Sequence, residues 1–213
     1  MTTRLPAFAR RLAQLLLGLF LYGIGISLMV RAGIGIAPWD VLTQGLSKQT
    51  GLSFGLLTIL IGVFVLLLWI PIRQKPGLGT VLNVLLIGPS AQFGLWLFPA
   101  FEGLWMQIPA FVCGVSLLAL ATGLYIGANF GPGPRDGLMT GLHRRTGCPI
   151  GVVRTGIEGS VLAAGWLLGG NAGWGTLAFA LCIGPMCAVT LRWFSPLPLA
   201  LAGDAAASTM PRD

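Results

Sequence analysis

The chain has 213 residues, of which 55% are hydrophobic and only 9% are charged, and its mean hydropathy is +0.85. A water-soluble domain of this length needs a far more charged surface, so the composition excludes that class and indicates an integral membrane protein. The formal net charge is +7. The basic residues form no patch interleaved with aromatic side chains, and we therefore expect no nucleic-acid partner.

Six apolar stretches each have the length of a membrane-spanning helix, roughly 20 residues at a rise of about 1.5 Å per residue. They cover residues 11–30, 52–72, 78–98, 108–127, 150–169 and 175–194. We predict an all-α membrane protein in which these stretches are six transmembrane helices. The first is expected to be a retained helix and not a cleaved signal peptide, because its counterpart lies in the middle of the chain.

The first half of the chain is repeated in the second half at a constant interval of 96 residues, without a gap. Between residues 18–89 and 114–185, 23 of the 72 aligned pairs are identical, and most of the identities are Gly, Pro, Asp or Thr. Two unrelated apolar segments would share Leu, Val and Ala instead. The repeat therefore concerns backbone geometry.

Basic residues are unequally distributed between the two sides of the predicted bundle. If the N-terminus is cytoplasmic, the outside segments carry Arg31 and Lys48, and Arg154 lies within a span. The inside segments carry Arg4, Arg10, Arg11, Arg73, Lys75, Arg135, Arg144, Arg145, Arg192 and Arg212. The positive-inside rule then predicts that both the N-terminus and the C-terminus are cytoplasmic.

Three spans in each repeat is an odd number, so the second repeat must enter the membrane in the opposite direction. We therefore predict two inverted three-helix repeats, at residues 11–98 and 99–194. A cytoplasmic N-terminus (1–10) precedes them, and a flexible cytoplasmic tail (195–213) follows them. In such an arrangement, matching motifs that dip inward from opposite faces converge at the middle of the bilayer.

A Gly- and Pro-rich loop follows the first span of each repeat and leads into a short helix, at about residues 39–49 and 135–146. Pro38-Trp39-Asp40 in the first loop matches Pro134-Arg135-Asp136 in the second. Proline suits the first position of a helix, and an early Asp complements the positive end of its dipole. The short helices are either re-entrant, which would bring Asp40, Arg135 and Asp136 together, or interfacial, with the two Asp residues as ordinary caps.

The third span of each repeat begins with Gly-x-Gly-Thr and contains Gly-Pro near its middle. Thr80 and Thr176 are predicted to be helix N-caps. Proline within a helix removes one backbone hydrogen bond, and in lipid the freed carbonyl needs a polar cavity, water or another helix. We predict that these breaks line a site, at Gly88, Pro89, Gly184 and Pro185, together with Pro38 and Pro134. The alternative is that the prolines only kink the helices.

Arg154 and Glu158 break the symmetry between the repeats, since their counterparts are Thr58 and Gly62. They are four residues apart and share one helix face. Ionised groups in a bilayer usually face the bundle interior. We predict that Glu158 binds a coupling proton or cation, or contacts the substrate, with Arg154 and Thr58 nearby. The alternative is a self-satisfied pair that stabilises packing, with Arg154 reaching the membrane surface.

No serine–histidine–acid set, metal-ligand cluster or phosphate-binding loop is visible, so we expect neither an enzyme nor a cofactor or metal. Cys113, Cys148, Cys182 and Cys187 show no CxxC spacing and indicate neither disulfides nor zinc. The partners expected are the lipid bilayer and a small-molecule or ion substrate of unknown identity. A homodimer is compatible with this class of protein.

Several of these motifs resemble those of the YczE/YyaS/YitT-type bacterial membrane proteins. The similarity is carried by Pro38-Trp39-Asp40-Val41-Leu42, by Thr50-Gly51-Leu52-Ser53-Phe54-Gly55, and by the stretch from Ala128 to Met139, and it extends over about residues 11–192. It implies a multi-pass protein of the bacterial inner membrane. It implies no particular substrate or activity.

We predict a small secondary transporter or permease whose site forms where the two repeats meet. Half-helix N-termini favour an anionic solute. One alternative is a non-transporting accessory or assembly partner of a membrane complex, which would use small faces such as Gly165-x-x-x-Gly169. Another is a substrate-binding subunit of a larger importer.

Overall fold

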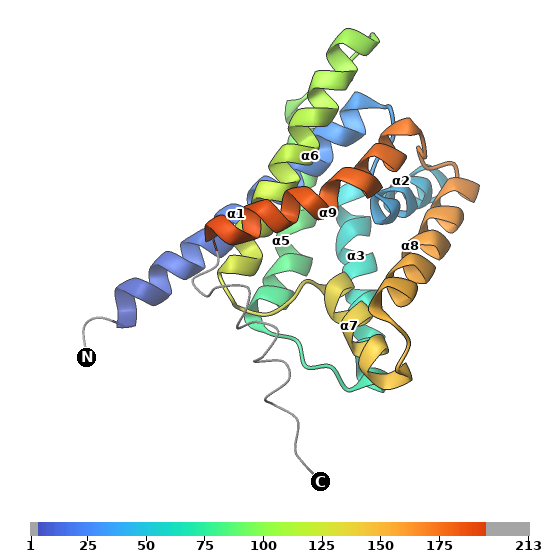
Figure 1. Ribbon diagram of the computed structural model, residues 1–213. Coiled ribbons are helices and arrows are strands. Elements are labelled where there is room, and N and C mark those ends of the chain that lie inside the picture. The colour runs from blue at the N-terminus through green and yellow to red at the C-terminus, as the bar shows by residue number, and fades with distance from the viewer. Residues whose placement is uncertain (1–3, 195–213) are drawn as a thin grey trace.

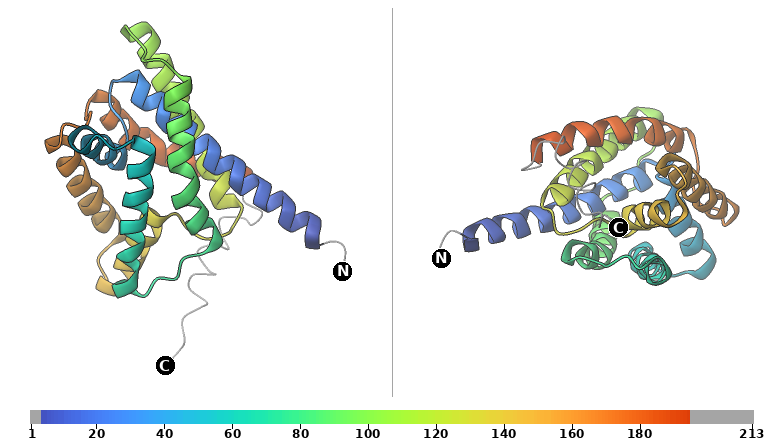
Figure 2. Two further views of the ribbon diagram at one scale, coloured as in Figure 1. Left: turned by 180° about the vertical axis from the view of Figure 1, so that it is seen from behind. Right: turned by 60° about the horizontal axis from the view of Figure 1, so that its bottom comes forward.

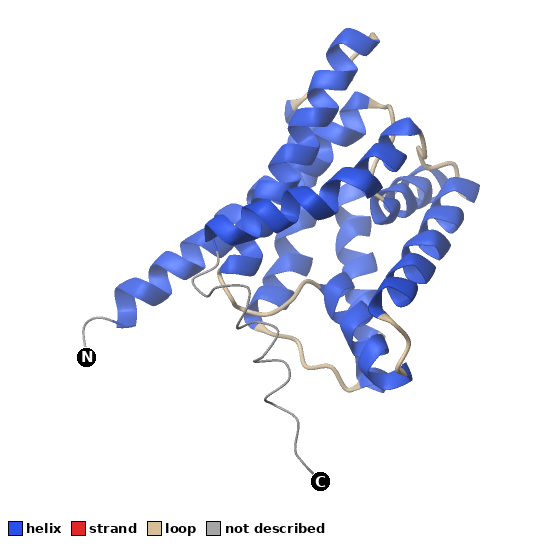
Figure 3. Ribbon diagram, viewed as in Figure 1, coloured by secondary structure: helices blue, strands red, loops and turns tan. Residues whose placement is uncertain are grey.

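The computed structural model describes residues 4–194, and within that range the chain is made of helices joined by short loops (Figure 3). The tail predicted at residues 195–213 lies outside the described residues, as do residues 1–3. The helices are α1 (Arg4–Ala32), α2 (Pro38–Thr50), α3 (Phe54–Leu67), α4 (Trp69–Ile72), α5 (Leu78–Leu97), α6 (Leu104–Gly127), α7 (Pro134–Thr146), α8 (Ile150–Leu167) and α9 (Trp174–Phe194).

Five of the described helices are long and apolar enough to cross a membrane: α1, α3 together with α4, α5, α6 and α9. They coincide with five of the six predicted spans. The helix α8 has 18 residues and coincides with the remaining one, but it is not among the five. Its charged residues, Arg154 and Glu158, lower its mean hydropathy.

The two halves of the fold follow the repeat in the sequence. Three helix pairs begin 96 residues apart, namely α2 and α7, α3 and α8, and α5 and α9. The long helices α1 and α6 pack along each other at the centre and run in opposite directions, while α5 packs against α1 and α9 against α6 (Figure 1). The view from behind shows α3 beside α5 (Figure 2).

Glycines allow α1 and α6 to approach at backbone distance. A Cβ added to Gly25 would lie 2.9 Å from the carbonyl oxygen of Gly114, and a Cβ added to Gly114 would lie 2.9 Å from that of Gly25. Such contacts leave no room for a side chain on either helix. Helix pairs in membranes pack closely through small residues in this way.

Matching hydrogen bonds join the start of the third long helix in each half to the loop of the other half. The Gly79 amide donates to the Phe130 carbonyl (2.8 Å), and its counterpart, the Gly175 amide, donates to the Ile34 carbonyl (2.9 Å). The prediction that Thr80 is an N-cap is wrong, because the cap residue of α5 is Gly77. Thr80 instead accepts a hydrogen bond from the Gly77 amide through its side chain (3.2 Å). Its hydroxyl also donates to the Pro132 carbonyl (2.7 Å).

The two halves differ in how their last two long helices pack. In the first half, α3 and α5 touch where Gly55 meets Gly88, and a Cβ on Gly55 would lie 2.6 Å from the Gly88 carbonyl oxygen. In the second half, the counterparts Gly151 and Gly184 have open space, since a Cβ on either would meet no atom of residues 4–194 within 4 Å. Equivalent glycines therefore form a closed contact in one half and a gap in the other.

Candidate functional site

The N-terminal ends of α2 and α7 meet inside the bundle. The Arg135 guanidinium lies 3.5 Å from the Asp40 carboxylate, measured from Nη2 to Oδ1, and it stacks over the Trp39 ring at 5.1 Å from the ring centroid. Trp39 and Arg135 occupy matching positions of the two repeats, and Asp40 is the next residue after Trp39. The last residues of both helices are exposed, so each short helix points its N-terminal end inward and its C-terminal end outward.

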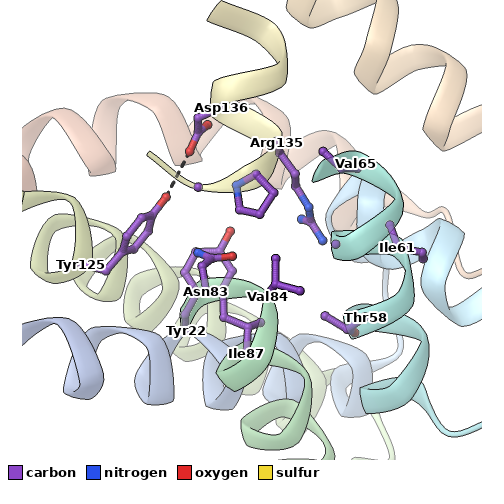
Figure 4. Close-up of a pocket in the computed structure, with 13 residues that line it drawn as sticks. Tyr22, Thr58, Ile61, Val65, Asn83, Val84, Ile87, Tyr125, Arg135 and Asp136 are labelled. Atoms are coloured by element: carbon purple, nitrogen blue, oxygen red, sulfur yellow. Dashed lines mark hydrogen bonds between the residues drawn. The ribbon is translucent and has the colours of Figure 1, made fainter. Parts of the chain in front are cut away.

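The two matching aspartates have different surroundings. The Asp40 side chain is only 1% exposed and is paired with Arg135, whereas Asp136 is exposed to an open cavity. Asp136 accepts a hydrogen bond from the Tyr125 hydroxyl at 3.1 Å (Figure 4). Neither helix has a hydrogen bond from a capping side chain. The two carboxylates therefore belong to a polar cluster in the bundle and do not act as ordinary caps.

Two cavities adjoin this cluster, and both are lined by Tyr22, Tyr125, Arg135 and Asp136. The smaller, of about 80 Å³, extends between α3 and α5 and is also lined by Thr58, Asn83 and Pro134 (Figure 4). The larger, of about 350 Å³, lies between α8 and α9 and is also lined by Pro38, Trp39, Arg154, Glu158, Gly184 and Cys187. The smaller has room for a few water molecules, while the larger falls in the size range of small-ligand sites.

Arg154 and Glu158 form the ion pair expected from their spacing, with 3.0 Å between Nε and Oε1. Their side chains are 54% and 28% exposed. They line the same cavity as Asp136. Glu158 therefore has its own cationic partner.

The structure brings only some of the predicted helix breaks to the site. Gly184 lines the larger cavity, but Gly88 lies in the contact between α3 and α5. Pro89 and Pro185 are exposed, lie within continuous helices and line neither cavity. Whether a proline faces the site depends on how its helix is rotated within the bundle. The Gly-Pro motif in the sequence does not define that rotation.

Sequence reasoning did not identify Tyr22, Tyr125 or Asn83 as site residues. The two tyrosines are the only ones in the chain, and their rings lie 6.0 Å apart between centroids. The signal available in the sequence was their occurrence within otherwise apolar spans. Trp39, which the sequence motif placed between Pro38 and Asp40, is buried against Arg135.

The polar cluster contains groups that have no partner within it. Three carboxylates (Asp40, Asp136 and Glu158) face two guanidinium groups, and within residues 4–194 Asp136 has no cationic side chain within 4 Å. In the described part of the chain, the Trp39 indole nitrogen is buried without a hydrogen-bond partner, and Asp40 Oδ1 has only its ion pair with Arg135 at 3.5 Å. Buried polar atoms are rarely left unpaired, so the indole nitrogen indicates a place for water or a ligand acceptor.

A bundle of apolar helices around a buried polar cluster defines a multi-pass helical membrane protein. The chain belongs to a family of unknown function, DUF6198, whose model matches residues 9–192. It is 37% identical to an uncharacterised Haemophilus influenzae protein over 189 residues, which are 89% of this chain and 87% of that protein.

Two Bacillus subtilis proteins are also similar and confirm the resemblance to YczE and YyaS. The uncharacterised membrane protein YczE is 34% identical over 192 residues (89% of this chain and 87% of that protein). The uncharacterised protein YyaS is 31% identical over 190 residues (85% and 90%). No solved structure matches the chain.

Proposed function

We propose that the protein is a small secondary transporter or permease, made of two inverted three-helix repeats with α8 as the sixth spanning helix. The opposite directions of α1 and α6, the helix starts 96 residues apart and the matching hydrogen bonds of Gly79 and Gly175 support this arrangement. The buried first turn of α2, its contact with Arg135 in the first turn of α7, and the exposed C-terminal ends of both helices support re-entrant rather than interfacial helices. Transporters with inverted repeats place their sites where such half-helices meet.

The observation that carries the proposal is the meeting of the two repeats at Arg135, Asp40 and Trp39, beside a cavity of about 350 Å³. A bundle that only supported another complex would have no need for ionised groups at its centre, because each is costly to bury in a membrane. The contact joins matching positions of the two halves. A conformational change at this contact can therefore be transmitted to both repeats.

The mechanism proposed is alternating access. Of the two matching carboxylates, Asp136 is exposed to the cavity and Asp40 is occluded, and of the two matching glycine contacts, Gly55–Gly88 is closed. In an inverted repeat, exchanging the conformations of the halves gives a state that opens to the other side. The second state would close α8 against α9 at Gly184 and open the first half.

Asp136 is the carboxylate best suited to bind a coupling proton or the positive group of a solute. Glu158 and Asp40 are paired with Arg154 and Arg135, whereas Asp136 has the Tyr125 hydroxyl as its partner. This assignment differs from the sequence-based preference for Glu158. Because Asp residues already occupy the first turns of both short helices, a cationic or zwitterionic solute also fits better than an anionic one.

The transport test uses protein reconstituted in liposomes that contain a pH-sensitive dye, with a panel of small amines, amino acids and carboxylates added outside. We expect solute-dependent proton movement with the wild type, its loss in Asp136→Asn, and its retention in Glu102→Gln. Glu102 is an exposed carboxylate in the loop before α6 and serves as the matched control. Equal activity of Asp136→Asn and wild type would remove Asp136 from the mechanism, and no flux with any solute would contradict transport.

The accessory-partner alternative loses its main support in the fold. Gly165 packs inside the bundle, where an added Cβ would lie 2.6 Å from the Cα of Leu42 in α2. That face is therefore not free for a partner helix. A stoichiometric partner that co-purifies from the membrane would restore this alternative.

A further inference from the structure

A separate polar cavity of about 430 Å³, open at the surface and lined by exposed arginines, lies between the segment that follows α4 and the C-terminal part of α7. Its lining includes three arginines, Arg73, Arg144 and Arg145, together with Gln74, Ile72 and Gly141. Among the described residues, no acidic side chain lines it. It shares no residue with the two cavities at the meeting of α2 and α7.

The two walls of this cavity are fixed to each other. Arg145 donates a hydrogen bond through its side chain to the Pro71 carbonyl. A Cβ added to Gly141 would lie 2.6 Å from Cδ1 of Ile72, so α7 and α4 are in close contact there. Arg73 ends α4 in the left-handed backbone region, with φ 55°, which turns the chain around the cavity. The arginines are therefore presented by a preformed structure.

Three guanidinium groups that line one cavity repel one another unless an anion lies between them. Within residues 4–194 none of them forms an ion pair with an acidic side chain. Arginine is well suited to phosphate, because its planar group can donate two parallel hydrogen bonds to the phosphate oxygens. The chemistry of the cavity is thus that of a phosphate-binding site.

The surroundings indicate that the phosphate belongs to a lipid. Apolar side chains on the neighbouring α3 and α4 are highly exposed, with Ile70 at 70% and Leu67 at 55%. In a membrane these side chains contact acyl chains, directly beside the arginines. Basic pockets between helices at a membrane face bind anionic lipid headgroups. We propose that Arg73, Arg144 and Arg145 bind the phosphate headgroup of an anionic membrane lipid.

The test measures thermal unfolding of the purified full-length protein in detergent while lipid is titrated. Phosphatidylglycerol is compared with phosphatidylcholine of the same acyl chains, and sodium phosphate is compared with sodium chloride at equal ionic strength. We expect a saturable rise of the unfolding temperature with phosphatidylglycerol alone. A full effect of sodium phosphate would mean a soluble ligand and would overturn the lipid assignment.

The variant Arg73→Gln/Arg144→Gln should weaken the apparent affinity for phosphatidylglycerol about 30-fold, at about fivefold for each arginine. The control Arg10→Gln/Arg192→Gln removes the same charge at two exposed arginines of α1 and α9. It should change the affinity by less than about threefold. If the first variant does not fold, Arg144→Gln alone, in the exposed last turn of α7, should show about a fivefold loss. Equal losses in the control, or no difference between the two lipids, would overturn the site.

Discussion

The glycine contact between α3 and α5 offers a test in which matching substitutions should have opposite effects. A Cβ at Gly88 would collide with the Gly55 carbonyl oxygen and lie 2.9 Å from Cγ1 of Ile59, while a Cβ at Gly184 would meet nothing within 4 Å. Gly88→Ala therefore penalises the state described here, by about 1–3 kcal/mol for overpacking. Gly184→Ala should penalise only the exchanged state, in which α8 closes on α9.

The gain in helix propensity from Gly to Ala, about 1 kcal/mol, is common to both states and cancels between them. A penalty of about 1–3 kcal/mol changes the ratio of the two states by roughly 5- to 160-fold. If the states have about equal free energy in the wild type, Gly88→Ala lowers the population with the open α8–α9 cavity from about one half to roughly one sixth or less. Gly184→Ala raises that population toward one.

Cys187 provides a native reporter, because it lines the larger cavity. With Cys113, Cys148 and Cys182 replaced by serine, we expect a water-soluble maleimide to label Cys187 about threefold or more slowly in Gly88→Ala than in the parent. In Gly184→Ala, Cys187 should be labelled as fast as in the parent or faster. Faster labelling in Gly88→Ala would indicate loosening of the fold rather than exchange of states, and would refute the reasoning.

Two further predictions concern the polar cluster. Arg135→Gln should cost about 3 kcal/mol of stability, because it leaves Asp40 buried without its cation, while Arg154→Gln removes a largely exposed partner and should cost less than about 1 kcal/mol. Chemical denaturation of both variants measures the difference, and equal costs would contradict the burial argument. Tyr125→Phe removes the hydrogen bond that stabilises the ionised form of Asp136, so the pKa of Asp136 rises. The pH dependence of flux should then move to higher pH, and an unchanged profile would separate Asp136 from proton binding.

Much of the fold could be predicted because glycine and proline mark its boundaries. The short helices predicted at 39–49 and 135–146 are observed at Pro38–Thr50 and Pro134–Thr146, since proline begins each and a left-handed glycine ends each. The Arg154–Glu158 pair followed directly from its four-residue spacing. Local chemistry was sufficient for these features.

Features that depend on helix rotation and crossing could not be predicted in the same way. Pro89 and Pro185 are exposed on their helices, although their spacing suggested a place in the site. Tyr22 and Tyr125 come together only because α1 and α6 cross at that depth. Their meeting is a result of tertiary packing. The helix periodicity within either span does not reveal it.

The difference between Gly55–Gly88 and Gly151–Gly184 is of another kind. The residues are identical in the two repeats, but one pair is in contact and the other is apart. Sequence could identify the pairs but could not show which is closed. Under the proposed alternating access, these two arrangements would exchange between the halves.

The most direct measurement of the inverted arrangement uses Thr50 and Thr146, which end α2 and α7, are 96 residues apart and are both exposed. Each is replaced by cysteine in a background without native cysteines, and intact cells are treated with a membrane-impermeant maleimide. Inverted repeats with a cytoplasmic N-terminus predict that Thr50→Cys is labelled in intact cells and that Thr146→Cys is labelled only after the membrane is opened. Labelling of both positions from the same side would contradict the inverted repeat and the permease built on it.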